Sequence, residues 1–578
     1  MNNEKARFVW VPLLIAVAIA GGILIGRFFS ADTSFGKTAR YDKIESLLQC
    51  IEQQYVDTVN RNDLIENVVP KVIGELDPHS AYIPAKDLES VNEELEGSFS
   101  GIGIQFNILN DTINVVSVIS GGPSEKVGIL AGDRIISVND SAFVGKNISN
   151  EKVMKNLRGP KGTTVKLEIL RKTAKNPLFY EVTRGDIPVN SVDAAYMLDD
   201  KSGYIKISKF GKTTYDEFIT ALSKLHNQGA ENFIIDLRGN SGGLMDAAIN
   251  MANEFLPANR LIVYAEGKAF EREDAVSNGT GTFQKEQVVV LTDEWSASAS
   301  EIFAGAIQDN DRGLIIGRRT FGKGLVQQQI PFRDGSAIRL TVARYYTPSG
   351  RCIQKEYQLG KSEDYSMDIV NRYMHGEFFN ADSIKQNKEL VFHTVNGREV
   401  YGGGGIMPDI FVPRDTTGVT SYFNNVANEG LLYQYAFDYT DKYRDKLSTA
   451  KDVESLLNIL EPNTLLNSFV QYAAQKGIRP RPVYINISRK LIVNTLQAYI
   501  ARNILGEEAF YKLLLRDDET LRKARDIVNK GEGYPEFLDE RKTTTAATGQ
   551  TVETDYLLGT ASSFITEYML GNRKATRF

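Results

Sequence analysis

The feature that most constrains the fold is an abrupt change of pattern between residues 288 and 307. Residues 288–292 read Val-Val-Val-Leu-Thr, a short β-branched run that is typical of a strand buried on both faces. Three serines follow within 296–300, and apolar residues then recur at helical spacing up to Ile307. The pattern therefore predicts a strand that ends in a serine-rich turn and continues as a helix.

Ser298 at this turn has two interpretations. With Glu301 it forms a Ser-x-x-Glu capping box, in which its hydroxyl satisfies an unpaired amide of the helix. Alternatively the hydroxyl is a nucleophile, because the amide of Ala299 and the positive end of the helix dipole could stabilise an oxyanion beside it. The turn alone does not decide between a cap and a nucleophile.

A serine nucleophile needs a base, and Lys323 is one candidate. It lies in Gly322-Lys323-Gly324 beyond a strand-like run, with apolar neighbours that would lower the pKa of its amine. The other interpretation is an ordinary surface lysine between flexible glycines. The chain has four histidines, none in a glycine-framed motif, and a Ser-His-Asp hydrolase would need one of them: His79, His226, His375 or His393.

The order and content of this segment resemble the carboxy-terminal processing peptidases, also called tail-specific proteases. In that family the first serine of Ser-Ala-Ser-Glu is the nucleophile, and a Gly-Lys-Gly with a later Gln supplies the base. Here Ser298 and Lys323 are 25 residues apart, and Gln327 lies four residues beyond the lysine. The resemblance implies a serine-type endopeptidase with a catalytic Ser-Lys dyad aided by Gln327, and no metal or other cofactor.

A second motif follows the predicted strand 233–237. The turn Arg-Gly-Asn-Ser-Gly-Gly at 238–243 lacks the spacing of a dinucleotide fingerprint and the Walker lysine, so a nucleotide site is not expected. Asp-Leu-Arg-x-Asn-x-Gly-Gly resembles the second signature of the peptidase family, in which the turn completes the oxyanion hole with the amide of Ala299. That role falls to Gly242 or Gly243, and the sequence leaves the choice open. We expect structural roles for three charged residues: Asp236, Arg238 and Asp309.

Short alternating strands between residues 97 and 172 resemble a PDZ domain in the permuted form of bacterial proteases. Such a domain binds a peptide carboxy terminus by adding it as a strand, while loop amides hold the carboxylate. We expect Gly101, Ile102, Gly103 and Ile104 to form that cradle, although a tight turn without a ligand is the simpler alternative. Arg158 is expected to couple peptide binding to the protease.

Residues 8–26 form an uncharged run of 19 residues after Lys5 and Arg7. That length suits a helix crossing a hydrocarbon core of about 30 Å, and the basic flank favours an inside amino terminus. A cleaved signal peptide is the alternative. We expect a single-pass anchor in the inner membrane with the catalytic body in the periplasm.

At 578 residues and 42% hydrophobic composition, the chain can form several cores. The expected fold is multidomain α+β, with an N-terminal transmembrane helix, a helical lead-in, a PDZ-like β domain, a ClpP/crotonase-like α/β protease core and a helical C-terminal region. The expected boundaries are 1–30 for the cytoplasmic tip and anchor, 31–96 for the lead-in, 97–172 for the PDZ domain, 173–412 for the protease core with an insertion at 354–390, and 413–578 for the C-terminal region, whose role the sequence does not indicate.

The expected partners are protein or peptide substrates with apolar carboxy termini and, through the N-terminal helix, the membrane. A net charge of −6 argues against nucleic acid, and a homo-oligomer is compatible with the sequence. Two other function classes are open. One is a PDZ-containing binding or chaperone protein on a protease-like fold without turnover, and the other is a crotonase-like enzyme acting on thioesters.

Overall fold

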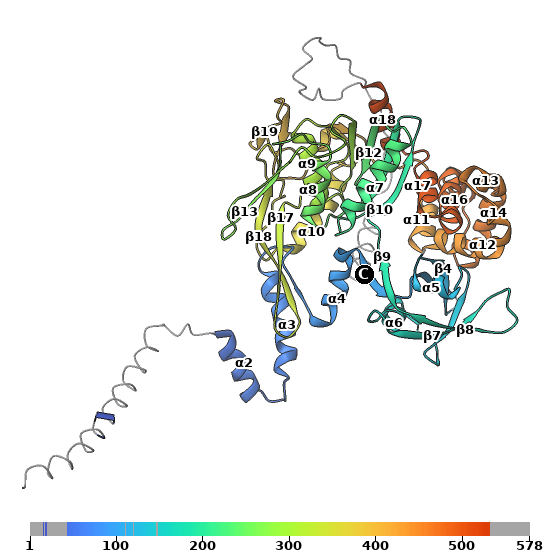
Figure 1. Ribbon diagram of the computed structural model, residues 1–578, viewed down its shortest axis with the longest axis horizontal. Coiled ribbons are helices and arrows are strands. Elements are labelled where there is room, and N and C mark those ends of the chain that lie inside the picture. Colours follow the sequence, from blue (N-terminus) through green and yellow to red (C-terminus); the bar gives the residue numbers. More distant parts are fainter. Residues whose placement is uncertain are drawn as a thin grey trace, which may run out of the picture. The chain divides into compact units, whose positions relative to one another are not determined.

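The structure is a computed structural model that describes residues 16, 18, 19 and 43–531, except 110, 120, 146 and 147 (Figure 1). The chain divides into two compact units, 1–72 and 73–578. In the first unit, helix α2 (Lys43–Gln54) and most of α3 (Arg61–Gly74) are described, and Arg61 pairs with Glu45 at 2.6 Å.

The predicted transmembrane helix requires a correction to the expected fold class. A bilayer-spanning helix needs about 20 apolar residues. No helix in the part of the chain that the structure describes reaches that length and apolar character. The run at 8–26 lies outside the described residues except for Ala16, Ala18 and Ile19. The described residues therefore form a multidomain α/β protein, and none of their helices could span a membrane.

The segment predicted to be a PDZ domain folds into a small antiparallel sheet around an apolar core that includes Ile113, Ile135 and Val165. The sheet order is β3-β4-β5-β7-β8, with β6 on β5, so among the described strands β3 has a neighbour on one side only. Helices α5 (Pro123–Val127) and α6 (Asn150–Leu157) accompany the sheet. Its strands are β3 (Ile104–Leu109), β4 (Thr112–Val118), β5 (Arg134–Val138), β6 (Ser141–Ala142), β7 (Thr164–Leu170) and β8 (Leu178–Thr183).

The centre of the molecule is a six-stranded sheet in the order β10-β11-β12-β15-β16-β21. All neighbours are parallel except β10 and β11. Its middle strands are continuous apolar runs because helices cover both faces. One face packs on α7 (Thr214–Asn227), α8 (Met245–Asn253) and α9 (Ala299–Asp309), and the other packs on α18 (Glu519–Lys530). The strands are β10 (Val192–Met197), β11 (Ser202–Ile207), β12 (Asn232–Asp236), β15 (Gln287–Thr292), β16 (Leu314–Gly317) and β21 (Ile410–Phe411).

A second sheet is built around the long strand β18 (Ala337–Tyr346). Strand β17 (Leu325–Pro331) pairs with it along nearly its whole length, and β1 (Ala81–Ile83) pairs with its first residues. At its other end β18 pairs with β13 (Leu261–Glu266), which continues the sheet to β14 (Glu273–Val276). Tyr345 of β18 is buried in the same core as α9, so this sheet lies against the serine helix.

The C-terminal helices form a separate core that includes Leu456, Phe469 and Leu496. Helices α17 and α18 also contact the central sheet, and α18 places Leu521 and Ala524 in its core. The helices are α11 (Ser421–Asn428), α12 (Leu431–Leu447), α13 (Val453–Ile459), α14 (Pro462–Gln475), α15 (Pro482–Ile487), α16 (Arg489–Leu505), α17 (Glu507–Leu514) and α18 (Glu519–Lys530).

The smaller elements connect these parts. Helix α10 covers part of the segment between the second sheet and β21, and buries Tyr365, Ile369 and Val370. These elements are α4 (Ala85–Glu96), β2 (Ser98–Gly101), β9 (Gly185–Pro188), α10 (Ser362–Met374), the 3-10 turn η1 (Ala381–Ser383), β19 (Val391–His393) and β20 (Glu399–Tyr401).

The buried ion pair at the end of α9 gives a test of the core. Arg351 and Asp309 are both fully buried and lie 2.7 Å apart. Because Arg351→Met would leave a buried unpaired carboxylate, we expect the free energy of unfolding to fall by about 3 kcal/mol in urea titrations. Lys201→Ala, which removes an exposed pair with Glu231, is the control and should leave the urea midpoint unchanged. Equal effects of the two substitutions would contradict this account of the core.

Candidate active site

Ser298 lies at the junction where β15 gives way to α9. Its backbone adopts φ +56° and ψ −115°, a conformation that L-residues rarely take. Such strain persists only where the surrounding structure holds it, and it often marks a functional position. The side chain is half-buried rather than enclosed. Ser298 therefore occupies a sharp turn between a strand and a helix, as a nucleophile would need.

Glu301, one turn into α9, joins the serine turn to the lysine loop. Its fully buried carboxylate accepts the Ser298 amide at 2.8 Å and the Lys323 amide at 2.9 Å on one oxygen. The other oxygen accepts the Gly322 amide at 2.8 Å and the Thr320 hydroxyl. Burial raises the pKa of Glu301, although these four donors oppose the shift. One carboxylate thus fixes two backbone segments that are far apart in sequence.

Tyr345 makes a second connection between the same segments. Its hydroxyl lies 3.0 Å from the carbonyl oxygen of Ser298 and 2.5 Å from that of Lys323. The side chain is buried in the main core, and this burial raises its pKa well above the ordinary value. Tyr345 therefore stays a neutral hydrogen-bond donor between the two carbonyl groups.

The amine of Lys323 is in the setting that the sequence predicts. Nζ donates to Oε1 of Gln327 at 3.2 Å, and Nε2 of Gln327 donates to the carbonyl oxygen of His79 at 2.5 Å. Burial lowers the pKa of Lys323, and the positive charge of Arg339 lowers it further. The structure thus brings Lys323 and Gln327 into direct contact in an environment that favours the neutral amine.

His79 lies near the amine of Lys323, but its ring is not positioned to act as a base for Ser298. Its ring nitrogen Nε2 is 2.9 Å from the hydroxyl of Tyr365, and burial together with Lys323 lowers its pKa to about 3. The ring is therefore neutral at pH 7, while the backbone carbonyl of His79 supports Gln327. Among the described residues no hydrogen bond joins a histidine ring to Ser298. The other three histidines are exposed: His226, His375 and His393.

The glycine turn lies directly against the serine turn. The carbonyl oxygen of Asn240 accepts the Ala297 amide at 3.0 Å and the Ser300 hydroxyl at 2.9 Å. A Cβ at Gly242, which has φ +99°, would come within 2.7 Å of Cβ of Ser298. Only glycine permits this approach. The predicted oxyanion-hole residues Ala299, Gly242 and Gly243 are thereby brought close together.

The two glycine amides differ in their partners. The Gly242 amide donates to Oδ1 of Asn240 at 2.8 Å and is already satisfied. The Gly243 amide has no hydrogen-bond partner among the residues that the structure describes. The amide of Gly243, at φ +143°, is therefore the one left available to a ligand.

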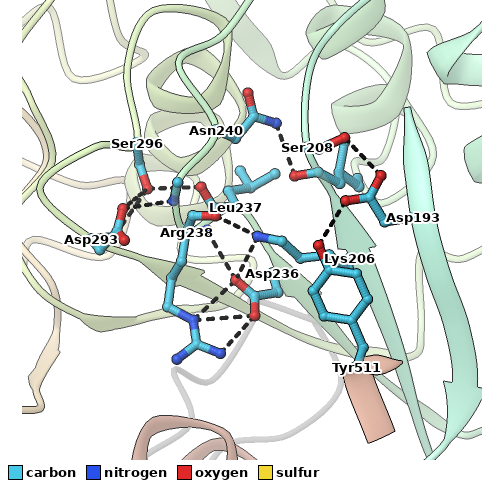
Figure 2. A network of polar contacts seen from close by, with 12 residues as sticks. Asp193, Lys206, Ser208, Asp236, Leu237, Arg238, Asn240, Asp293, Ser296 and Tyr511 are labelled. Carbon is cyan, nitrogen blue, oxygen red and sulfur yellow. Dashed lines mark hydrogen bonds and ion pairs between the residues drawn. The ribbon is translucent and has the colours of Figure 1, made fainter. Parts of the chain in front are cut away.

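Polar contacts hold the glycine turn on the sheet, and Figure 2 shows Lys206 and Arg238 converging on Asp236. Arg238 donates to Asp236 at 2.7 Å, and Nζ of Lys206 lies 3.5 Å from the same carboxylate. Burial alone would raise the pKa of Asp236, but these two cations hold it well below the usual range. At the other side of the turn, the Gly239 amide donates to Asp293 at 2.9 Å.

Asp309 lies at the opposite end of α9 from Ser298, about 16 Å along the helix axis. It pairs with Arg351 at 2.7 Å and accepts the Ser349 hydroxyl at 2.7 Å. These contacts are internal to the core and do not reach the lysine amine. Asp309 is thus in a position to support the serine helix from its far end.

The predicted carboxylate cradle is a loop between β2 and β3. The carbonyl oxygens of Ile102 and Gly103 accept the Ser124 and Ile119 amides at 2.9 and 3.0 Å, which braces the loop. The amides of Ile102 and Gly103 have no partner within the described part of the chain, and Gly103 has φ +76°. Gly101 and Ile104 belong to the strands on either side. The loop can therefore offer two backbone donors beside the open edge of β3.

Arg158 lies at the end of α6, close to this loop. It pairs with Glu93 of α4 at 2.6 Å, and its guanidinium lies 4.2 Å from the ring centre of Phe99 in β2. Its side chain also borders Gly101, where an added Cβ would lie 3.8 Å from Cγ of Arg158. Arg158 thus links the binding loop to α4, outside the small sheet.

Three residues around Lys323 have roles that the sequence did not indicate. The sequence indicates Glu301 only as part of a capping box, although an acidic residue within an apolar helix pattern is a usable signal. Tyr345 carried no signal within its strand. Lys355 packs between Phe321 and Tyr365, with Nζ 3.9 and 4.1 Å from the ring centres, and burial lowers its pKa to about 8. Its position depends on α10, which the sequence did not predict.

Comparison with known proteins decides the family. Residues 201–367 match the model of peptidase family S41, residues 100–178 match the PDZ domain model, and residues 422–506 match a family of unknown function. The chain is 34% identical over 387 residues to a carboxy-terminal-processing protease of Bartonella bacilliformis, covering 66% of this chain and 86% of that protein. The chain belongs to the carboxy-terminal processing protease family.

One further relative and one solved structure are also similar to the chain. Carboxy-terminal processing protease CtpA of Bacillus subtilis is 37% identical over 319 residues, which cover 55% of this chain and 67% of that protein. A solved photosystem II D1 C-terminal processing protease is 29% identical, with a TM-score of 0.31, and covers 53% of this chain and 82% of that chain. The protein is thus a serine-type peptidase with a PDZ domain that binds peptides or proteins. The resemblance inferred from the sequence is confirmed, whereas the individual site roles stay predictions.

The Glu301 carboxylate gives a direct test of the site geometry. Glu301→Gln keeps the size of the side chain but replaces an accepting oxygen with an NH₂ group, which would face backbone donors. Because the buried amides of Ser298 and Lys323 would lose part of their acceptor, we expect kcat to fall at least about tenfold, as measured with a fluorogenic peptide. An unchanged kcat would show that this carboxylate does not hold the site together.

The charge of Arg339 gives a test by pH. Since Arg339 lowers the pKa of Lys323, Arg339→Gln should raise that pKa and move the ascending limb of kcat/KM to higher pH. Arg344→Gln is the matched control, since Arg344 is exposed on the same strand and should leave the profile in place. A shift to lower pH, or equal shifts in both variants, would contradict the assignment of Lys323 as the titrating base.

Proposed function

We propose that this protease is an endopeptidase in which Ser298 is the nucleophile and neutral Lys323 is the general base. The observation that carries the proposal is the single buried carboxylate of Glu301, which accepts the backbone amides of both residues at 2.8 and 2.9 Å. The lowered pKa of Lys323 supports it, because an amine must be neutral to accept a proton.

In the first half of the reaction, Nζ of Lys323 takes the proton of Oγ of Ser298 while that oxygen attacks the scissile carbonyl carbon. The tetrahedral intermediate collapses as the protonated amine of Lys323 gives its proton to the leaving nitrogen. An acyl ester on Ser298 remains. Water then attacks the ester with Lys323 again as base, and the proton returns to Oγ of Ser298 as the acid product leaves.

The oxyanion of the intermediate is assigned to the amides of Ala299 and Gly243. The Ala299 amide belongs to the first turn of α9, where the helix dipole adds a partial positive charge. Gly243 is preferred to Gly242 because the Gly242 amide already donates to Asn240. Loss of one such donor typically costs about 3 kcal/mol of transition-state stabilisation.

Gln327 is proposed to orient the amine. Its side-chain oxygen accepts from Nζ of Lys323 at 3.2 Å, and the His79 carbonyl fixes the other end of the amide at 2.5 Å. This arrangement leaves the nitrogen lone pair free for the serine proton. His79 then contributes through its backbone, and its neutral ring adds no charge that competes with the lysine.

The PDZ domain is proposed to select substrates by an apolar carboxy terminus. Within the described residues the amides of Ile102 and Gly103 have no partner, which suits a terminal carboxylate, and the edge of β3 is unpaired, which suits an added strand. Arg158 is proposed to couple peptide binding in the PDZ domain to the activity of the protease core through its ion pair with Glu93. On this proposal, a substrate that lacks the tail is cleaved more slowly.

Cellular location and assembly belong to the same proposal. The apolar run at 8–26, with basic residues before it, supports export, so we place the catalytic body in the periplasm. Exposed apolar side chains on α2, among them Leu47 at 59% exposure, are compatible with self-association into a homo-oligomer.

The test compares wild type, Ser298→Ala and Lys323→Ala on an unfolded protein with an apolar carboxy terminus. Both variants should lose at least about a thousandfold in kcat while remaining folded by circular dichroism. His226→Ala is the control and should keep full activity, as should a substitution at any histidine side chain that leaves the fold intact. Retained proteolysis by Lys323→Ala would rule out the dyad.

The same substrate with an amidated carboxy terminus tests the PDZ assignment. Amidation removes the negative charge that the Ile102 and Gly103 amides are proposed to bind, so KM should rise severalfold. Equal rates on the free acid and the amide would contradict recognition of the terminal carboxylate.

A further inference from the structure

We propose that Asp518, in the C-terminal helical region, is a positioning residue for the oxyanion hole. The inference deepens the proposed function and rests on the role given there to the glycine turn 238–243. It assigns a catalytic purpose to the contact that the helical region makes with this turn.

The contact between the two parts is specific. Nη1 of Arg238 donates to both carboxylate oxygens of Asp518, at 3.0 and 2.9 Å. The Asp518 side chain is 23% exposed and that of Arg238 is 14% exposed, so water screens the pair only in part. Arg238 is the first residue of the glycine turn, and its other guanidinium nitrogens are held by Asp236.

The two carboxylates act on opposite ends of one guanidinium. Asp236 binds Nε and Nη2 of Arg238 from the end of β12, and Asp518 binds Nη1 from the start of α18. Lys206 donates to the backbone carbonyl of Arg238, as Figure 2 shows. Since a planar guanidinium held on two sides has little freedom, the backbone entering the glycine turn is fixed in orientation.

This fixation reaches the oxyanion hole through the turn itself. Gly243 lies five positions after Arg238, and the turn between them is fastened to the serine side by Asn240 and Gly239. The Asn240 and Gly239 contacts fix the position of the turn on the serine side. The Arg238 contacts fix the position of the residue at which the chain leaves the sheet and enters the turn. A displaced turn would move the Gly243 amide, and small misplacements of a catalytic group can cost large factors in rate.

Asp518 is also the N-cap of α18, because its Oδ1 accepts the Leu521 amide at 2.7 Å. The cap keeps the carboxylate in place, since α18 is anchored by Leu521, Ala524 and Val528 in the core of the central sheet. The helical region therefore presents this charge from a rigid element. Other polar contacts join the helical region to the rest of the chain away from the turn, among them Lys224 with Glu508 and Tyr511 with Asp193.

The contact between Lys224 and Glu508 provides a matched control for the contact between Arg238 and Asp518. Asp518→Asn keeps an N-cap that asparagine serves well but removes the charge facing Arg238. Glu508→Gln removes a charge of the same helical region from its exposed contact with Lys224, without touching the turn. Asp518→Glu retains the charge and tests rescue.

The experiment measures kcat and KM of the full chain with one fluorogenic peptide, together with the melting temperature. We expect Asp518→Asn to lower kcat about fivefold or more with KM nearly unchanged, Asp518→Glu to recover part of kcat, and Glu508→Gln to match wild type. An unchanged kcat in Asp518→Asn, or an equal fall in Glu508→Gln, would overturn the proposal. Ser298→Ala, measured alongside, distinguishes a failure of the Asp518 proposal from a failure of the proposed function. Retained activity in Ser298→Ala would contradict the proposed function itself.

Discussion

The arrangement of this protease depends on one buried carboxylate, that of Glu301. An ionised carboxylate is expensive to bury unless donors surround it, and four donors from two distant segments do so here. The interaction works in both directions. The donors of the serine turn and the lysine loop stabilise the buried carboxylate, and the carboxylate in turn satisfies the backbone amides of both segments. The strained backbone of Ser298 can persist because this carboxylate and the adjoining glycine turn both hold it.

The surroundings of Lys323 follow from the second sheet. Strand β17 delivers Gln327 opposite Thr341 of β18, and the turn before β1 brings the His79 carbonyl to the other side of that amide. Burial and the positive charge of Arg339 lower the pKa of Lys323, the carboxylates of Glu301 and Asp77 oppose that shift, and no carboxylate hydrogen-bonds its amine among the described residues. Sheet geometry and electrostatics therefore act together to lower the pKa of the amine.

The sequence predicted the family and the short motifs well, because strand-to-turn transitions and glycine spacing are local signals. The proximity of Ser298 and Lys323 could be inferred only from resemblance, since Glu301 and Tyr345 join them through contacts that have no local pattern. The predicted transmembrane helix was wrong for the described fold, because no helix of the described residues is long and apolar enough to cross a membrane. Helix α10 and the contact of Asp518 with Arg238 were missed, as both depend on packing between distant segments.

The central claim is that the surroundings of Lys323 lower the pKa of its amine below that of an exposed lysine. Competitive acetylation of the Ser298→Ala protein across a pH series, read by peptide mass spectrometry, would give separate titration midpoints for Lys323 and for the exposed Lys201. The account predicts a midpoint for Lys323 clearly below that of Lys201 and below the usual lysine value of about 10.4. A midpoint at or above that of Lys201 would contradict it.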